Sequence, residues 1–334
     1  MARPGRVAYV SAMPGAHVRP FQVGDIPAAG ALLAARHRAH RLSCRLLSPR
    51  YEHESAATAQ VAAAFALPGA SGAVAVQDGD IAGFLLGAPK PSPVWGPNVW
   101  VDAAGHAAAE PELVRDMYAL AAARWVGESR RAQYVLVPAS DEGLLRAWYR
   151  LGFGQQQAHA VRPPPDETPA VPPNVAVRRA RRSDLPTLAA LEAELPRQHS
   201  MAPVFSASPV PGYEECLAGW EQDFDDPAYT TFVAELDGVV IGSSIGCSLE
   251  LSSSHPPMTR PDHAGFLAFA AVVPHARGLG AGRALGEAVI AWTAQAGYHC
   301  VAADWRVTNL LSSRTWPRLG FTESFLRLHR LVGY

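Results

Sequence analysis

An internal repeat constrains the fold of this chain more than any other feature of its sequence. VRPFQVGDIPAAGALL, from Val18, and VRRARRSDLPTLAALE, from Val177, share Val, Arg, Asp and Pro in register, 159 residues apart. In both, a short strand pattern leads to an Asp and then a Pro. This is typical of a helix start, because Asp caps the helix and Pro lacks only an N–H that the first turn leaves unbonded. Each half is therefore expected to begin with a strand and a helix.

Two further pairs of segments extend the repeat. Asp-Gly at residues 78–79 and again at 237–238 lies between alternating apolar runs, which predicts a β-hairpin in each half. DEGLLRAWYRLGF, from Asp141, matches NLLSSRTWPRLGF, from Asn309, with a longer offset of 168 residues. The two halves therefore share their beginning, a hairpin and their ending.

The length of the chain also favours two domains. A single hydrophobic core usually stops growing at about 250 residues, and this chain has 334. The proline-rich segment 161–175 is typical of an extended spacer, with the boundary expected near Pro172. The sequence predicts domains over 1–165 and 166–334.

Composition limits the classes of function. With 49% hydrophobic residues and a net charge of -1, the chain has no strong field to attract polyanions, so neither a nucleic-acid nor a membrane partner is expected. No apolar stretch is typical of a signal peptide or a membrane span, and a cytoplasmic location is expected. The four cysteines are far apart and form no CxxC pair, which argues against a disulfide framework and a zinc ribbon.

A glycine-rich stretch, PHARGLGAGRAL, runs from Pro274 to Leu285. It follows a buried-strand pattern over 265–274 and precedes an amphipathic helix pattern that ends at Gly297. The first turn of a helix has unbonded N–H groups and a positive dipole end, and glycines allow phosphates to approach the backbone. The stretch therefore predicts a diphosphate-binding turn.

Three phosphate ligands compete for this turn. Gly278-x-Gly280 begins a dinucleotide pattern, but Arg283 replaces the third glycine and only 30 residues follow Asp304, too few for the remaining βαβ units. A nucleoside triphosphate loop needs a lysine after its last glycine, and the one lysine of the chain is Lys90. Coenzyme A is the third ligand.

Arg277-x-x-Gly280-x-Gly282 resembles the R/Q-x-x-G-x-G/A pyrophosphate signature of the GNAT superfamily of acyl-CoA N-acyltransferases. Asn309, Trp316 and the LGF sequence at 319–321 resemble the segment that ends the family's domain. The resemblance covers most of 174–334 and, through the repeat, about 17–160. The chain is identified as a tandem GNAT protein, similar to the mycothiol-synthase type and to tandem proteins of actinobacterial biosynthetic clusters.

This resemblance implies an α/β (α+β) fold of two tandem GNAT domains, each a mixed, mostly antiparallel sheet flanked by helices. It implies acyl transfer, most simply from acetyl-CoA, to the amine of a small molecule by direct attack in a ternary complex, with no metal. The oligomeric state is left open. The residues implied in binding acyl-CoA are Val272, Val273, Arg277, Gly278, Leu279, Gly280, Ala281, Gly282, Asn309 and Ser312.

The residues that transfer protons are less clearly indicated. Trp316 stands where many members carry a Tyr that protonates the leaving thiolate, and an indole is no useful acid. Trp316 is interpreted as a packing residue, like Trp148 at the equivalent site. Phe266 stands where several members carry a Glu base. The remaining candidates for the base are Asp304, taken first, His263, His199 and Glu194, and Ser312 is the second catalytic candidate.

The segment ELPRQHSMAPVF, from Glu194 to Phe205, follows the first helix of the second half. Members of the family place substrate-contacting loops there, so Arg197, Gln198 and His199 are candidates for reading the acceptor. A plain surface loop is the alternative.

The first half is expected to be a degenerate GNAT-like domain. Ala109-Glu110-Pro111-Glu112 aligns with Arg277 to Gly280, and its two carboxylates would repel a diphosphate. Asp141 replaces Asn309, so an ionised acceptor stands where a donor is needed. Two other functions remain open for the whole chain: a CoA-binding module without catalysis, and a structural protein that uses the tandem scaffold alone.

Overall fold

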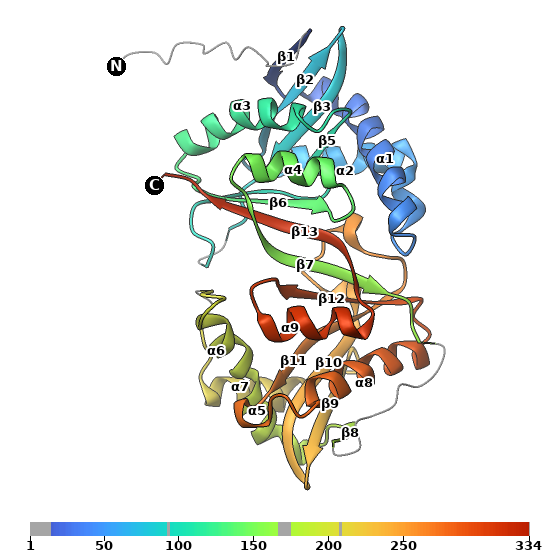
Figure 1. Ribbon diagram of the computed structural model, residues 1–334, viewed down its shortest axis with the longest axis vertical. Helices are drawn as coiled ribbons and strands as arrows, with labels where there is room; N and C mark the ends of the chain where they lie inside the picture. The colour runs from blue at the N-terminus through green and yellow to red at the C-terminus, as the bar shows by residue number, and fades with distance from the viewer. Residues whose placement is uncertain (1–14, 92–93, 166–174, 207–208, 334) are drawn as a thin grey trace. The chain divides into compact units, whose positions relative to one another are not determined.

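The computed structural model describes residues 15–91, 94–165, 175–206 and 209–333 (Figure 1). The chain divides into two compact units: Met1–Gln155 with Phe325–Tyr334, and Gln156–Ser324. The expected boundary near Pro172 and the N-terminal residues 1–14 lie outside the described residues.

In the first unit, β1, β2, β3 and β5 pair in this order, all antiparallel. β4 pairs in parallel with β6, and β6 pairs antiparallel with β13. The strands are β1 (Ala16–Pro20), β2 (Ser71–Gln77), β3 (Asp80–Gly87), β4 (Asn98–Val101), β5 (His106–Ala108), β6 (Ala132–Pro138) and β13 (Thr322–Leu331). The helices are α1 (Ile26–Ser43), α2 (Glu54–Ala66), α3 (Leu113–Gly127) and α4 (Glu142–Arg150).

In the second unit, the strand order is β7-β12-β11-β10-β9-β8, with β11 and β12 parallel and the other neighbours antiparallel. The strands are β7 (Gly154–Arg162), β8 (Ala176–Arg179), β9 (Tyr229–Leu236), β10 (Val239–Ser248), β11 (Ala264–Val272) and β12 (Cys300–Arg306). The helices are α5 (Leu185–Glu192), α6 (Glu194–Ser200), α7 (Tyr213–Asp223), α8 (Ala281–Gln295) and α9 (Leu310–Thr315).

The two faces of this second sheet carry different helices. A Cβ added to Gly246 or Gly265 would collide with Trp292 or Thr293, so α8 lies close against that face. Ile245, on the opposite face of β10, shares a pocket with Trp220 of α7. The sheet is thus covered by α8 on one side and by α5 and α7 on the other, which confirms the mixed, mostly antiparallel sheet flanked by helices.

The repeat also appears in the contacts that begin each half. Arg19 holds Asp25 through two hydrogen bonds of 2.8 and 2.7 Å, and Arg178 holds Asp184 at 2.7 and 3.0 Å. The two Asp residues occupy the predicted N-cap positions, but the predicted cap bonds are wrong. Each carboxylate instead accepts a backbone N–H from three residues earlier, at Gln22 and Arg181, and so closes the short turn before the helix.

Both predicted hairpins are confirmed. β2 and β3 turn at Asp78 and Gly79, with φ of 53° and 93°, and β9 and β10 turn at Asp237 and Gly238, with φ of 50° and 79°. Two successive positive φ angles define the tight turn whose twist matches that of the strands it joins.

The last strand of each half pairs within the other unit. β7 follows the first half along the chain but pairs with β12, from Arg162–Val301 to Gln157–Arg306. β13 ends the second half and pairs with β6, from Phe325–Pro138 to Leu331–Ala132. The predicted domain ranges, 1–165 and 166–334, assign each of these strands to the half that it ends and not to the unit in which it pairs.

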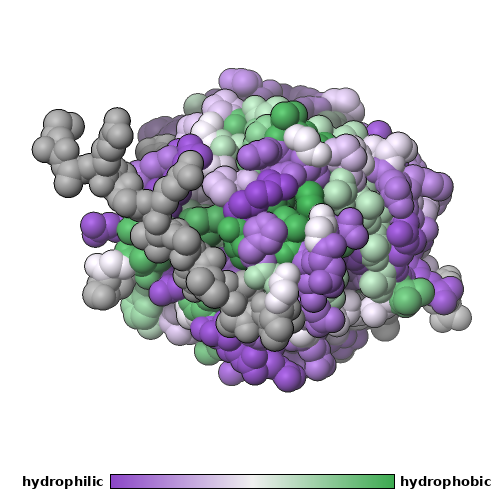
Figure 2. All heavy atoms as spheres, turned by 90° about the horizontal axis from the view of Figure 1, so that it is seen from above, coloured by the Kyte–Doolittle hydropathy of each residue, from purple (hydrophilic) through white to green (hydrophobic). Residues whose placement is uncertain are grey.

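Large apolar side chains fill the cores of both units, with Trp125 and Trp148 wholly buried in the first and Leu188 and Val233 in the second. In Figure 2, hydrophilic residues are interspersed with hydrophobic ones over the visible face. None of the described helices is long and apolar enough to span a bilayer.

Candidate functional site

The site is built where the parallel strands β11 and β12 separate. Their pairing runs from Ala264–Cys300 to Leu267–Ala303, after which β11 continues to Val272 and β12 to Arg306. At the same point, the register with β10 passes from Leu267 to Phe269 and skips Ala268. This is a β-bulge, a feature that re-aims backbone groups beside active sites. Ala268 is exposed, and nothing in the sequence indicated it.

The β11 backbone beyond the bulge can accept an extended ligand. On one edge of β11, Ala271 and Val272 still pair with Ser243 and Gly242 of β10. On the other edge, the pairing with β12 has already ended. Backbone N–H and C=O groups require partners. A chain with amides of its own, such as pantetheine, can bind there as an added strand would.

The glycine-rich turn follows directly. After β11, a short 3-10 turn (Pro274–Ala276) leads to Gly278 and Gly280, with φ of 84° and 93°. Gly280 is the N-cap of α8, and the first helical bond runs from the Ala284 N–H to the Gly280 carbonyl, 3.0 Å. The N–H groups of residues 281–283 therefore have no partner within the helix, and Gly278 and Leu279 are exposed. This geometry suits a diphosphate.

Arg277 connects this turn to α6. Its guanidinium donates to the Val272 carbonyl, 3.2 Å, and to Gln198 Oε1, 2.7 Å, and lies 3.7 Å from Glu194 Oε2. The segment from Glu194 was expected to be a loop, but residues 194–200 form a short helix. Residues expected to bind the cofactor and residues expected to read the acceptor thus lie in direct contact.

Asn309 and Ser312 lie at the start of α9. Asn309 Oδ1 accepts the Leu311 N–H at 3.2 Å, and its Nδ2 lies 3.4 Å from His199 Nε2. The Ser312 hydroxyl donates to the Asn309 carbonyl at 3.3 Å. Val273, whose N–H donates to the Ile241 carbonyl at 2.9 Å, lies beside Val272 at the end of β11. The amide of Asn309 thus faces the imidazole on α6.

Asp304 lies on β12 one residue beyond the last pair with β11. Its carboxylate accepts hydrogen bonds from Gln157 Nε2, 2.6 Å, and from the Ser254 hydroxyl, 3.2 Å, and lies 3.8 Å from His255 Nδ1. These contacts hold the carboxylate in one orientation.

The charge of Asp304 acts on His199. Burial lowers the pKa of His199 below its ordinary value, the Arg306 charge lowers it further, and Asp304 raises it in part. The imidazole is therefore neutral at neutral pH and can accept a proton. Asp304, His199 and Asn309 come from three elements that the sequence alone did not bring together.

The remaining candidates have other surroundings. His263 precedes β11, and its ring contacts Tyr298 and His299 at 5.0 and 5.1 Å. The strand separates it from the glycine turn by about 30 Å. Phe266 packs on His255 at 5.1 Å. Among the described residues, no group of His, Cys, Asp and Glu could hold a metal ion.

Both tryptophans of the repeated ending pack in cores. Trp316 is 8% exposed, and a Cβ added to Gly286 of α8 would lie 2.9 Å from its ring. Trp148 is wholly buried among Tyr118, Phe153 and His106. This environment favours the packing interpretation of both residues.

The corresponding helix start in the described part of the first unit, before α3, has no such glycine turn. Glu112 lies at the start of α3 and binds Arg115 at 2.8 Å and Arg150 at 2.5 Å. The hydrogen bond from Arg115 is the main cause that holds the Glu112 pKa below its usual range, and Arg150 adds to it. The carboxylate of Glu112 thus lies at the start of α3, whereas the equivalent start of α8 in the second unit presents backbone N–H groups with no partner within the helix.

The strand before that helix is also interrupted. β4 pairs with β6 and β5 pairs with β3, with residues 102–105 between them. Arg36 of α1 donates to the carbonyls of Ala103, 2.5 Å, and His106. His106 Nε2 lies 2.9 Å from the Leu136 carbonyl of β6, to which it donates, and the side chain is wholly buried. The side chains of Arg36 and His106 therefore form hydrogen bonds with backbone carbonyl groups of this region.

Buried His106 makes the stability of the first unit sensitive to acid. Burial, with a smaller effect of Arg36, lowers its pKa to about 3, well below the 6.5 typical of an unfolded chain. As the pH falls from about 6.5 towards 3, the unfolded chain binds the extra proton and the free energy of unfolding decreases, by up to about 1.4 kcal/mol per pH unit.

We expect His106→Gln, which keeps a donor for Leu136, to flatten this decrease. Urea unfolding at pH 7, 6 and 5 checks it, with exposed His17→Gln as control, and an unchanged slope in His106→Gln would contradict it.

Comparison with known proteins relates the second unit to one family. Residues 190–321 match the family model described as "Acetyltransferase (GNAT) family". Comparison with curated protein sequences finds no match.

Solved structures match over nearly the whole chain. A GCN5-related N-acetyltransferase from Sphaerobacter thermophilus is 16% identical, with a TM-score of 0.56 over 97% of this chain and 98% of that one. The glucosamine N-acetyltransferase region of a fungal multi-domain β-N-acetylglucosaminidase is 14% identical, with a TM-score of 0.52 over 96% of this chain and 38% of that one. A tandem protein from the clavulanic acid biosynthesis pathway is 14% identical, with a TM-score of 0.46 over 96% and 99% of the two chains.

Proposed function

We propose that this chain, which has the fold of the GNAT acetyltransferases, transfers an acyl group from acyl-CoA to the amine of a small molecule, using the second unit. The observation that carries the proposal is the separation of β11 from β12 at a bulge, followed directly by the glycine turn of α8. An open strand edge and a helix start with free N–H groups are the two elements that a pantetheine arm and a diphosphate require.

The residues of the site have distinct proposed roles. The backbone from Ala268 to Val272 would hold the pantetheine arm, and residues 277–282 would hold the diphosphate. Acetyl-CoA is the simplest donor and supplies an activated thioester. Ala268 is exposed at the bulge, and we assign to its N–H the role of polarising the thioester carbonyl.

The transfer requires one proton to leave the amine and one to reach the leaving group. The amine nitrogen bonds to the acyl carbon, and the carbon–sulfur bond breaks. We assign the first proton to the neutral imidazole of His199, whose pKa is lowered by burial and raised in part by Asp304. The Ser312 hydroxyl, beside Asn309, would relay a proton to the thiolate through water. The four cysteines, all within the described residues, form no disulfide, which fits a reducing compartment and supports the cytoplasm as the site of action.

Release of free CoA tests the function. Purified protein with acetyl-CoA is incubated with a panel of small amines, and a thiol reagent measures the CoA released over a blank without amine. We expect release that depends on the amine and saturates with its concentration. Tight acetyl-CoA binding without release across the panel would instead favour a binding module, and no CoA binding would favour a structural protein.

A further inference from the structure

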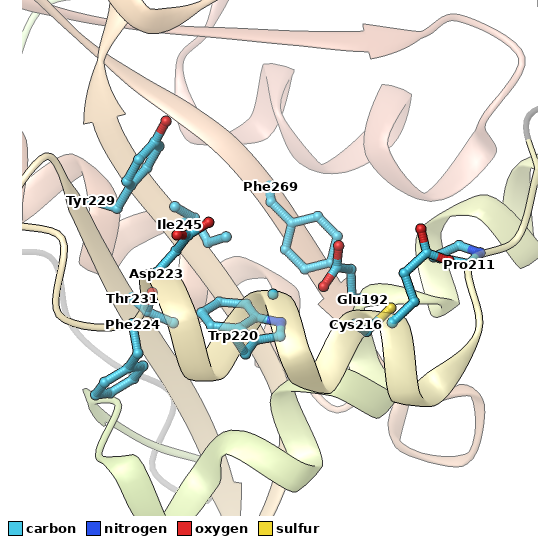
Figure 3. A pocket seen from close by; sticks show the side chains of 12 residues that line it. Glu192, Pro211, Cys216, Trp220, Asp223, Phe224, Tyr229, Thr231, Ile245 and Phe269 are labelled. Carbon is cyan, nitrogen blue, oxygen red and sulfur yellow. The ribbon is translucent and has the colours of Figure 1, made fainter.

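A pocket of about 460 Å³ lies between α7 and the sheet of the second unit (Figure 3). Its floor is formed by one residue from each of three neighbouring strands. Ile245 of β10 pairs with Thr231 of β9 on one side and with Phe269 of β11 on the other. Trp220 and Phe224 form the opposite wall. This volume is within the range typical of small-ligand sites.

The pocket adjoins the bulge. Phe269 lines it and directly follows Ala268, whose N–H we assign to the thioester carbonyl. The pocket also opens on the sheet face that is not covered by α8. A ligand in the pocket can therefore present an amine to the thioester from the side opposite α8.

Among the described residues, the charged groups that line the pocket are all negative. They are Glu192, Glu215 and Asp223, and no described Lys, Arg or His lines it. None of the three takes part in an ion pair within the described part of the chain, whereas Asp225, two residues beyond the end of α7, pairs with Arg182. Glu192 is close enough to the Cys216 thiol to raise its pKa, after burial, the main cause.

The carboxylates are spread over the length of the pocket. Glu215 and Asp223 are eight residues apart on α7, about 12 Å along the helix axis. Glu192, at the end of α5, lies with Cys216 near the first of them. Between the ends, the lining is aromatic, with Trp220 and Phe269. A ligand that fits has an apolar middle and positive charge away from its reacting nitrogen.

We propose that the acceptor is a diamine: one nitrogen is acylated beside Ala268, and the second remains protonated beside a carboxylate of the pocket, either Glu192 with Glu215 at one end or Asp223 at the other. This rests on the proposed function. The second nitrogen supplies binding energy in the ground state and positions the first, which attacks as the free base.

Three amines of matched shape test the proposal: 1,4-bis(aminomethyl)benzene, benzylamine and 4-(aminomethyl)benzoate. With acetyl-CoA, we expect kcat/KM to be at least about tenfold higher for the diamine than for benzylamine, and lowest for the anionic benzoate. Glu192→Gln combined with Asp223→Asn should remove most of the advantage of the diamine. Glu214→Gln combined with Glu221→Gln, at two exposed acids of α7 outside the pocket, removes the same net charge and should leave the advantage unchanged.

The outcomes separate the two proposals. If no amine releases CoA, the proposed function fails. If benzylamine or the benzoate reacts as fast as the diamine, or if the double variant keeps the preference, transfer to an amine stands and the diamine proposal is overturned.

Discussion

Gly280→Glu is expected to abolish binding of acetyl-CoA, weakening it by about 100-fold or more. Gly280 has a φ of 93°, which costs a residue with a side chain roughly 1–2 kcal/mol. The new carboxylate would also stand at the start of α8 and repel the diphosphate. Isothermal titration of the wild type should give a stoichiometry near one, and the variant should show no binding.

The same titration tests whether the second unit holds the single site. Gly127→Glu adds the same charge at an exposed position at the end of α3, where a Cβ meets nothing within 4 Å. This control should bind like the wild type. Two sites per wild-type chain, or binding that survives in a folded Gly280→Glu variant, would contradict a single site at the glycine turn.

His199→Gln is expected to lower kcat by about 100-fold or more, because general base catalysis typically contributes 10²–10⁴. The KM for acetyl-CoA should change much less than kcat, since His199 lies on α6 and is not part of the glycine turn that would hold the diphosphate. His263→Gln is the matched control, because this histidine lies at the other end of β11. A wild-type kcat in His199→Gln would exclude the imidazole as the base.

Asp304→Asn separates a charge effect from a structural one. Asp304 raises the pKa of His199, against burial and Arg306, which lower it. Removing the carboxylate charge should lower the pKa of His199, so the acidic limb of the kcat–pH profile should move to lower pH. A variant that lost activity without this movement would indicate that Asp304 only supports the fold.

The sequence predicted those features that local chemistry determines. The Asp-Gly hairpins and the glycine turn of α8 depend on a few adjacent residues whose backbone preferences are strong. The repeat added the order of the elements. The difference between the two turns was also visible in the sequence, because Glu112 of the first half aligns with Gly280 of the second.

Features that depend on distant contacts were not predicted. The bulge at Ala268 depends on the register with β10, and the run GFLAFAAV contains no residue that signals it. Likewise, the contact of Arg277 with α6 joins segments 79 residues apart. Arg36 in the first unit reaches carbonyls about 70 residues further on, so only the fold reveals that this region is occupied.

The exchange of β7 and β13 affects how such a chain can be divided, in the laboratory and in evolution. A gene fragment that ended at the proline-rich spacer would encode β6 without β13 and would carry β7 without β12. Each fragment would expose unpaired strand edges, which favour aggregation. Once the repeated halves had exchanged these strands, loss of the first half would have removed a strand from the second. The first half is therefore retained by the architecture, whether or not it binds a ligand.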